Sequence, residues 1–340
     1  MTASGHGMRH HSTSGARRRR ARKNSVSRLY EGLLTEQSNP LTLALDQKSP
    51  LAIVDLIHAE DRRALAAVSK ERHEIAQAIE MVLEAFRSGG RLIYVGAGTS
   101  GRLGVLDAAE CPPTFGVRPG LVRGIIAGGR RALVRSIEGA EDKASDGKRA
   151  MARAKVSKCD VVMGIATCSL TPYVHGALTE AKRLGAKTIF LSCTPRGPGS
   201  PRADLYITPL VGPEVITGST RMKAGTATKL VLNAITTGAM VRWGKTLGNL
   251  MVDLRVVNRK LEERALRILR DVAGIRKSAA RILLRKARGE VKTALAMRFL
   301  GVGPSEARRR LQDVNGFLRR LLPPRHSESQ FLIGTKNLII

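Results

Sequence analysis

Aromatic residues are scarce in this 340-residue chain, at 3% of all positions, with one Trp, four Tyr and six Phe. A core must therefore consist mainly of aliphatic side chains and alanine. The hydrophobic share of 43% is typical of a globular protein of this length. No apolar run approaches the ~20 residues that a membrane-spanning helix needs, so we expect no membrane contact.

Cysteine is also rare, and its spacing excludes two common uses. The four cysteines are Cys111, Cys159, Cys168 and Cys193. Their spacing gives neither a CxxC pair nor a zinc-finger pattern. The arginine-rich start is not followed by an apolar segment, which does not resemble a secretory signal. We therefore expect reduced thiols and a cytoplasmic location.

Acidic residues are too few to balance the basic ones: 28 Asp and Glu face 58 Lys and Arg, a net charge of +30. Much of the excess lies in residues 17–23 and beyond Arg255. Such a field attracts phosphorylated ligands and nucleic acid alike. Solvated helix faces explain basic runs more simply, and these runs lack base-stacking aromatics. We expect nucleic acid to bind only non-specifically, through the basic tail.

The order of the segments predicts an α/β protein with a doubly wound parallel sheet and a small C-terminal helical subdomain. Continuous apolar runs alternate with helical patterns, as in a sheet covered on both faces. We expect strands at 92–95, 124–127, 160–166, 187–192 and 204–207. We expect one helical stretch over 50–86, then helices at 101–109, 144–154, 172–184 and 223–243. The expected domains are a disordered basic extension (1–27), the sheet domain with N-terminal helices (28–258), the helical subdomain (259–324) and an irregular tail (325–340).

A glycine-rich turn follows the first expected strand and contains Gly98, Thr99 and Ser100. Backbone N–H groups and two hydroxyls converge there at a helix N-terminus, an arrangement that binds phosphate. The turn lacks the Gly-Lys-Ser/Thr of a nucleotide P-loop and a complete GxGxxG pattern, so ATP and NAD are not favoured. A tight turn without a ligand is the alternative.

Two further polar clusters open helices. After the third strand come Cys168, Ser169 and Thr171, and parallel sheets bind ligands where such loops meet. Ordinary N-capping is the alternative there. The third cluster could reach a phosphate or a sugar, or could be a capped core helix with exposed lysines. It contains Glu214, Ser219, Thr220 and Lys223.

Two carboxylates are candidates for acid–base chemistry. Glu110 is expected just beyond the first helix of the sheet, beside a Cys-Pro-Pro turn, and Glu141 between a strand and a helix. Two carboxylates divide acid and base roles when their environments separate their pKa values. Spacing alone does not distinguish Glu141 from Glu138 or Asp142, and a solvated acidic turn remains open. The pattern alone thus indicates an anion site with a nearby carboxylate.

Several long motifs resemble the N-acetylmuramic acid 6-phosphate etherases, in the same order along the chain, and the related glucokinase regulator more distantly. The matching segments are residues 35–40 (TEQSNP), 92–113 (LIYVGAGTSGRLGVLDAAECPP), 126–129 (IAGG), 138–142 (EGAED), 212–226 and 248–253 (GNLMVD). The resemblance implies a sugar isomerase (SIS) domain and a homodimer with active sites near the subunit interface. It implies no metal and no organic cofactor.

The resemblance also implies a reaction: elimination of D-lactate from N-acetylmuramate 6-phosphate, then water addition to give N-acetylglucosamine 6-phosphate, in cell-wall recycling. It assigns Glu110 to the elimination, Glu141 to water addition, and the phosphate to the first two loops. The second loop departs from the family pattern, which has Ser, Gly and Arg where this chain has Cys168, Ser169 and Leu170. A catalytically weak sugar-phosphate-binding regulator is therefore the alternative function.

Overall fold

The centre of the molecule is a five-stranded parallel sheet, as predicted. The computed structural model describes residues 33–323 apart from 198, 255 and 257. The predictions for 1–27 and 325–340 thus lie outside the described residues. The strand order is β2-β1-β3-β4-β5. The strands are β1 (Leu92–Gly96), β2 (Val122–Ile126), β3 (Val161–Ile165), β4 (Lys187–Leu191) and β5 (Leu205–Ile207).

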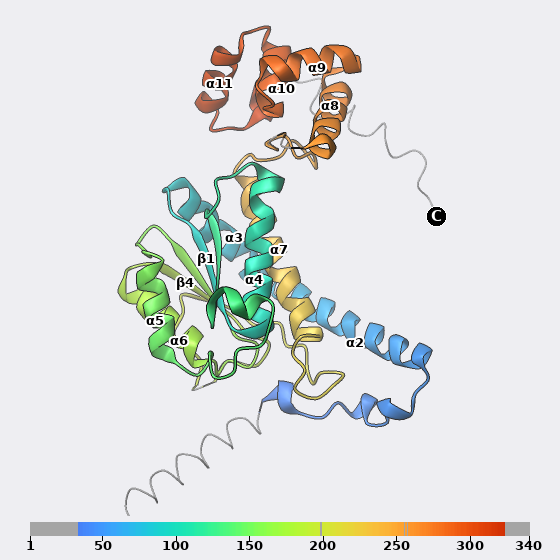
Figure 1. The fold of residues 1–340 in the computed structure, drawn as a ribbon, viewed down its shortest axis with the longest axis vertical. Coiled ribbons are helices and arrows are strands. Elements are labelled where there is room, and N and C mark those ends of the chain that lie inside the picture. Colours follow the sequence, from blue (N-terminus) through green and yellow to red (C-terminus); the bar gives the residue numbers. More distant parts are fainter. Residues whose placement is uncertain (1–32, 198, 255, 257, 324–340) are drawn as a thin grey trace, which may run out of the picture.

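Helices cover both faces of the sheet (Figure 1). Along β1, Leu92 and Tyr94 pack against one set of helices, while Ile93 and Val95 pack against the other. This alternation explains why the strands are apolar throughout. The first set is α3 (Arg72–Arg87), α4 (Gly98–Phe115) and α7 (Lys223–Arg242), and the second is α5 (Ala144–Arg153) and α6 (Pro172–Arg183).

The stretch expected to form one helix over 50–86 forms two, which corrects that prediction. α2 (Pro50–Lys70) extends away from the body and α3 packs on the sheet (Figure 1). The break is at Glu71, whose carboxylate accepts a hydrogen bond from the Thr208 N–H at 2.8 Å. Three short 3-10 turns precede α2: η1 (Leu34–Glu36), η2 (Pro40–Thr42) and η3 (Leu45–Gln47).

The end of α4 also differs from the expectation. The helix continues through Pro112 and Pro113 to Phe115, so Glu110 lies inside it rather than beyond it. The two prolines cannot donate to the carbonyls of Ala108 and Ala109, of which Ala108 is buried and Ala109 is exposed to water. Gly116 ends the helix in the left-handed conformation, and a Cβ there would collide with the carbonyl oxygen of Asp253.

The C-terminal helices have a hydrophobic cluster of their own, between Leu247 and Leu318. They are α8 (Arg259–Ala273), α9 (Lys277–Lys286), α10 (Val291–Leu300) and α11 (Pro304–Asp313), followed by the 3-10 turn η5 (Leu318–Leu321). Buried Lys292 ties this part to the preceding segment, because its ammonium contacts Asp253 at 2.6 Å and the Gly244 carbonyl at 2.9 Å.

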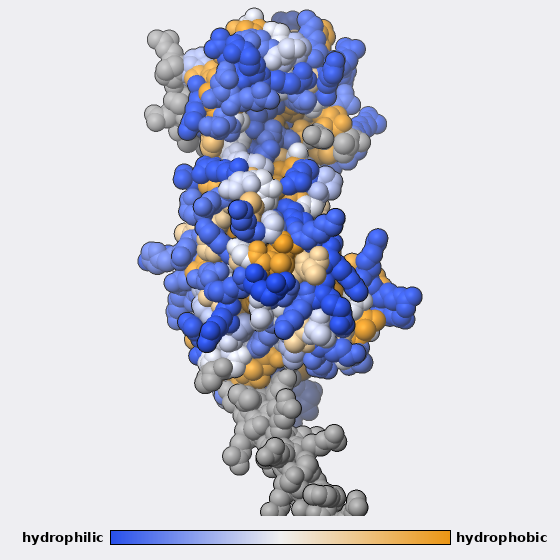
Figure 2. Space-filling model, turned by 90° about the vertical axis from the view of Figure 1, so that its left-hand side faces the viewer, coloured by the Kyte–Doolittle hydropathy of each residue, from blue (hydrophilic) through white to orange (hydrophobic). Residues whose placement is uncertain are grey.

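Hydrophilic side chains cover most of the face shown in Figure 2, with apolar residues between them. Within the described part of the chain, no helix is both long enough and apolar enough to cross a membrane.

Candidate active site at the carboxyl edge of the sheet

The first loop has the predicted strand–turn–helix geometry. α4 begins at Gly98, directly after β1, and Gly98 adopts a positive φ of 52°. Ser100 is buried and Thr99 is half-buried in the first turn. The first N–H groups of a helix have no partner within it, so this turn presents donors to an anion.

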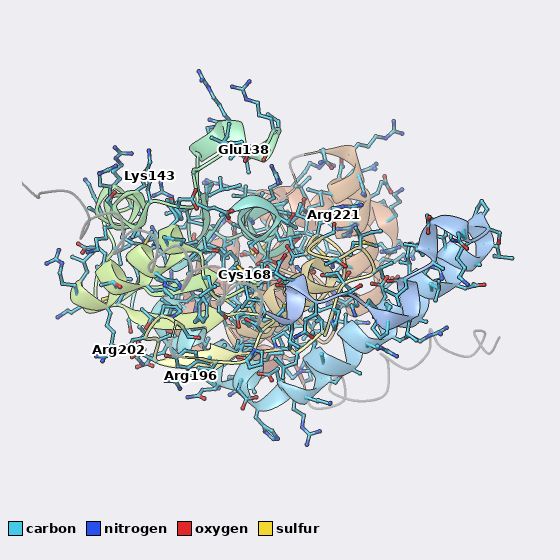
Figure 3. All side chains as sticks on the ribbon, turned by 90° about the horizontal axis from the view of Figure 1, so that it is seen from below. Glu138, Lys143, Cys168, Arg196, Arg202 and Arg221 are labelled. Atoms are coloured by element: carbon cyan, nitrogen blue, oxygen red, sulfur yellow. The ribbon has the colours of Figure 1, made fainter. Side chains whose placement is uncertain are left out.

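The second loop lies at the end of β3, the neighbour of β1 in the sheet. Ser169 has a φ of 64°, a left-handed conformation that favours glycine. Its hydroxyl lies 2.9 Å from the Thr194 hydroxyl, and the His175 Nε2–H donates to its carbonyl at 2.6 Å. Cys168 is half-buried and lies near the middle of the molecule seen from below (Figure 3).

The capping alternative is not what the second loop shows. Thr171 occupies the N-cap of α6 and is buried, yet its side chain makes no cap hydrogen bond. The Ser169 hydroxyl is directed to Thr194 instead of the helix. The Thr171 hydroxyl is therefore not used by its own helix.

Glu141 is brought close to both loops. The Tyr173 N–H, in the first turn of α6, donates to the Glu141 carbonyl at 2.9 Å. Glu141 and Gly98 line one small cavity of about 90 Å³ together with Arg102. Partial burial raises the pKa of Glu141 above its usual value, and the nearby Asp142 adds to the effect. A carboxylate with a raised pKa is a better proton acceptor near neutral pH.

Arg102 holds the loop that leads to Glu141, a role the sequence did not reveal. Its guanidinium donates to the Leu133 carbonyl and to the Arg135 carbonyl, both at 3.3 Å. Glu138, the competing carboxylate, accepts a hydrogen bond from Ser136 at 3.2 Å. Glu138 lines the same small cavity as Glu141, so what ties Glu141 to the start of α6 is its backbone contact with Tyr173.

The third cluster divides into two groups. Glu214 is fully buried, and its carboxylate accepts the N–H groups of Lys223 and Ala224 at 2.9 and 3.0 Å, so it caps α7. Lys223 is not an exposed lysine: it is buried and paired with Glu60. Burial raises the pKa of Glu214, although the two N–H bonds oppose the shift.

Ser219 and Thr220 are half-buried and remain available at the edge. They precede α7, and a Cβ added to Gly225 in its first turn would lie 3.7 Å from Thr99 Cγ2 and 3.5 Å from the Thr220 carbonyl. The third cluster thus adjoins the first loop.

The N-terminal turns brace this third cluster. The Gly218 N–H donates to the Thr35 carbonyl at 3.0 Å, and the Thr42 hydroxyl donates to the Val215 carbonyl at 2.9 Å. The Asn39 amide donates to buried Glu60 at 3.0 Å. The motif at 35–40 therefore has a structural role that only the tertiary fold reveals.

Glu110 is the candidate that lies apart. It is exposed on α4, twelve positions after Gly98, which at about 1.5 Å per residue separates the two by ~18 Å. The exposed stripe of α4 that contains it consists of Leu106, Ala109, Glu110 and Pro113. One turn earlier, buried Asp107 accepts hydrogen bonds from Tyr94 and Asn233 at 2.9 and 2.6 Å, a network that sequence reasoning missed.

The described residues contain no group of three or more His, Cys, Asp or Glu side chains that could hold a metal ion. The site is therefore built from hydroxyls, backbone N–H groups, carboxylates and arginine. A parallel sheet with hydroxyl-rich loops over helix N-termini at its carboxyl edge defines an α/β protein with an anion site at that edge. A family model described as the glucokinase regulatory protein N-terminal SIS domain matches residues 74–182.

Relatives named N-acetylmuramic acid 6-phosphate etherase from Rhodopirellula baltica and Picosynechococcus sp. are 52% and 53% identical over 290 residues, which cover 85% of this chain and 96% of each relative. The chain therefore belongs to the N-acetylmuramic acid 6-phosphate etherases. Solved structures with similarity include phosphoheptose isomerase from Neisseria gonorrhoeae, 19% identical with a TM-score of 0.44, covering 56% of this chain and 99% of that chain.

Proposed function

We propose that this protein cleaves the D-lactyl ether of N-acetylmuramate 6-phosphate, giving N-acetylglucosamine 6-phosphate and D-lactate in amino-sugar recycling. The observation that carries the proposal is the identity of about half of all positions over 96% of the length of two etherases. This makes the protein a carbon–oxygen lyase. We place it in the cytoplasm, where the phosphorylated sugar would be its small-molecule partner.

The phosphate would lie over two helix N-termini. The N–H groups and hydroxyls of Gly98, Thr99 and Ser100 approach it from one loop, and Cys168, Ser169 and Thr171 from the other. The free hydroxyl of Thr171 supports this arrangement. Ser219 and Thr220 are placed to contact the sugar. Glu214 and Lys223 support the site indirectly, because their buried contacts hold the start of α7 in place.

The chemistry follows from the ring-opened sugar, whose aldehyde acidifies the proton on C2. A carboxylate removes that proton, the C3–O bond breaks, and lactate leaves with the electron pair of that bond. Water then adds to C3 of the unsaturated aldehyde, and a proton returns to C2. We assign the elimination to Glu110 and the activation of water to Glu141. The sequence of steps requires neither a metal nor an organic cofactor.

A homodimer would bring the two carboxylates together. A hexose phosphate is shorter than the ~18 Å between Gly98 and Glu110 along α4, so one chain cannot place both on one substrate. Glu110 and Leu106, which is 53% exposed, share the outward stripe of α4 beside α7. We propose that α4 and α7 of two copies meet there, and that each site receives Glu110 from the other copy.

The test is incubation of the purified protein with N-acetylmuramate 6-phosphate and enzymatic measurement of D-lactate. We expect Glu110→Gln to lower lactate release at least 100-fold, since general acid–base catalysis contributes about 10²–10⁴-fold. Glu84→Gln is the matched control, because Glu84 is an exposed carboxylate that pairs with Lys187. Equal rates for Glu110→Gln and the unchanged protein would contradict the assignment.

The second candidate, a sugar-phosphate sensor with weak turnover, is favoured by the altered loop. Leu170 supplies no cation where the family has arginine, and a lost charge-assisted bond of about 1.5–3 kcal/mol weakens binding roughly 10- to 150-fold. Saturable binding of the substrate without release of lactate would identify the sensor.

Nucleic acid is expected to bind only non-specifically, through the overall positive charge, with an affinity that falls steeply as the salt concentration rises.

A further inference from the structure

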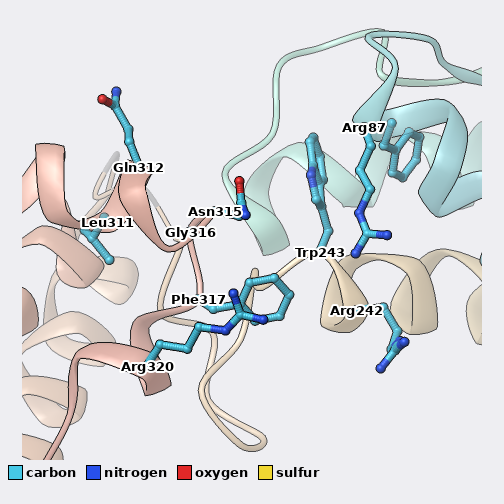
Figure 4. Close-up of a pocket in the computed structure, with 10 residues that line it drawn as sticks. Arg87, Arg242, Trp243, Leu311, Gln312, Asn315, Gly316, Phe317 and Arg320 are labelled. Carbon is cyan, nitrogen blue, oxygen red and sulfur yellow. The ribbon is translucent and has the colours of Figure 1, made fainter.

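The cavity on which our inference depends lies far from the carboxyl edge of the sheet. It has a volume of about 850 Å³ and lies where the last turns of α3 and α7 face α11 and η5 (Figure 4). α7 is twenty residues long, so this end is about 30 Å from Lys223, where the third cluster begins. The side chains that matter here are Phe86, Arg87, Arg242, Trp243, Phe317 and Arg320.

Aromatic rings are concentrated in this cavity. The chain has one Trp and six Phe, and that Trp and two of the Phe line the cavity. Trp243 packs against Phe86 with ring centroids 5.3 Å apart, and the Lys245 ammonium lies 4.8 Å from the centroid of the same Trp243 ring. Phe317 is half-buried, and the Arg320 guanidinium lies over its ring, 4.9 Å from the centroid, so a planar group that stacks on this face takes the place of Arg320. Figure 4 shows Trp243 between Phe317 on one side and Arg87 on the other.

The cavity is also positively charged. Among its described lining residues none is acidic, and three are arginines. Arg242 contacts Glu80 at 3.5 Å, but both side chains are exposed, and such surface pairs contribute little. Arg87 and Arg320 are exposed as well. The arginines can therefore turn toward an anion without breaking a buried interaction.

We propose that this cavity is a second ligand site and that it binds a nucleotide. The base takes the place of the Arg320 guanidinium on Phe317, beside Trp243, while the phosphates contact Arg87, Arg242 and the displaced Arg320. Rings beside guanidinium groups match a ligand that joins a planar ring to an anion. The volume lies within the roughly 300–1,000 Å³ of small-molecule sites. The amides of Gln312 and Asn315 line the cavity and can hydrogen-bond the edge of the base.

This proposal is independent of the etherase reaction, and the protein supplies its own reporter. Trp243 is the only tryptophan, so intrinsic fluorescence excited near 295 nm reports on this cavity alone. ADP is the probe, titrated into the full-length protein at physiological ionic strength, with calorimetry as a second readout. We expect a saturable fluorescence change, with ADP binding at least 10-fold more tightly than inorganic phosphate or adenosine alone.

Matched variants locate the site. Arg87→Gln, Arg320→Gln and Phe317→Leu should each weaken ADP binding about 10-fold, as expected for the loss of one charge-assisted bond or one stacked base. Arg309→Gln is the control, because Arg309 is an exposed arginine on α11 that pairs with Glu306 outside the cavity. Its affinity should stay within twofold, and circular dichroism should show the same fold for all four.

Three results would overturn the proposal. The first is no saturable signal at millimolar ADP, and the second is phosphate that binds as tightly as ADP, which would leave the rings without a role. The third is a single-stranded oligonucleotide that binds more tightly than ADP and is weakened by the same variants. That result would make the cavity part of a nucleic-acid surface. None of these results depends on lactate release.

Discussion

Ser169 holds a backbone conformation that costs a non-glycine residue about 1 kcal/mol. Its hydroxyl offsets part of this cost through the buried contact with Thr194 at 2.9 Å. The family pattern has glycine at this position. In this chain the serine itself adopts the left-handed conformation, and its hydroxyl contacts Thr194.

Two substitutions separate strain from hydrogen bonding at Ser169. Ser169→Ala keeps the strain and loses the hydroxyl, so we expect the free energy of unfolding to fall by about 1–2 kcal/mol. Ser169→Gly loses the hydroxyl but relieves the strain, so it should stay within about 0.5 kcal/mol of the unchanged protein. Urea unfolding gives both values, and equal losses for the two variants would argue against strain at this position.

Asp107 gives a prediction about pH. Burial raises the pKa of its carboxyl, despite hydrogen bonds from Tyr94, Asn233 and Thr236 that oppose the shift. A raised folded-state pKa means that stability rises as pH falls through it toward the unfolded value near 4. Asp107→Asn removes this titration. We expect the free energy of unfolding of the unchanged protein, relative to that of this variant, to increase as the pH falls from 7 to 4.

Parallel urea titrations of the two proteins at each pH provide the measurement, since other titrating groups cancel in the difference. A difference that is constant with pH would show that the carboxyl has an ordinary pKa.

Asp107→Ala tests the hydrogen-bond network around this carboxyl. It leaves the buried Tyr94 hydroxyl without its acceptor and should lower the free energy of unfolding by about 2–4 kcal/mol.

At the scale of elements, the strands and most helices were predictable because each gives a local signal. Continuous apolar runs mark β1 and β3, and glycine or proline marks many boundaries. α4 was predicted too short, since paired prolines usually end a helix, and here an exposed position lets water replace a lost bond. The division of α2 from α3 also escaped prediction, because the break depends on a contact between Glu71 and Thr208.

The start of α7 is an element whose stability depends on one side chain. Glu214 accepts two backbone N–H groups in a fully buried position, where unsatisfied donors are costly. We expect Glu214→Ala to lower the free energy of unfolding by about 2–4 kcal/mol, measured by urea unfolding. Glu263→Ala, at an exposed ion pair with Lys277, is the control and should change it by less than 1 kcal/mol.

The candidate site was only partly predictable, because some of its residues are far apart along the chain and meet only in the folded protein. The loops at Gly98 and Ser169 follow strands, so their meeting at one edge follows from topology. The buried network of Asn39, Glu60 and Lys223 joins distant parts of the chain through packing, and no local pattern announces it. Glu214 and Lys223, which we predicted as substrate contacts, also make buried interactions that no local pattern indicates.

At the scale of the whole molecule, the proposed dimer makes a direct prediction. Leu106→Glu places a charge in the outward stripe of α4 and should convert a dimer to a monomer in sedimentation velocity. Lactate release should fall at least 10-fold, while the circular dichroism spectrum stays unchanged. Ile282→Glu is the matched control, since Ile282 is 50% exposed on α9, outside that stripe.

A dimeric Leu106→Glu protein with normal activity would show that the copies meet elsewhere. A monomeric variant with full activity would show that one chain forms a complete site, and would contradict the shared arrangement of Glu110.

The contact between Gly116 and Asp253 joins the two halves of the molecule through backbone alone. No side chain separates the Gly116 backbone from the Asp253 carbonyl oxygen. A displacement of Gly116 at the end of α4 therefore displaces Asp253 as well. Because α4 runs from Gly98 to Phe115, a displacement at Asp253 would be passed along this helix to the loop at Gly98.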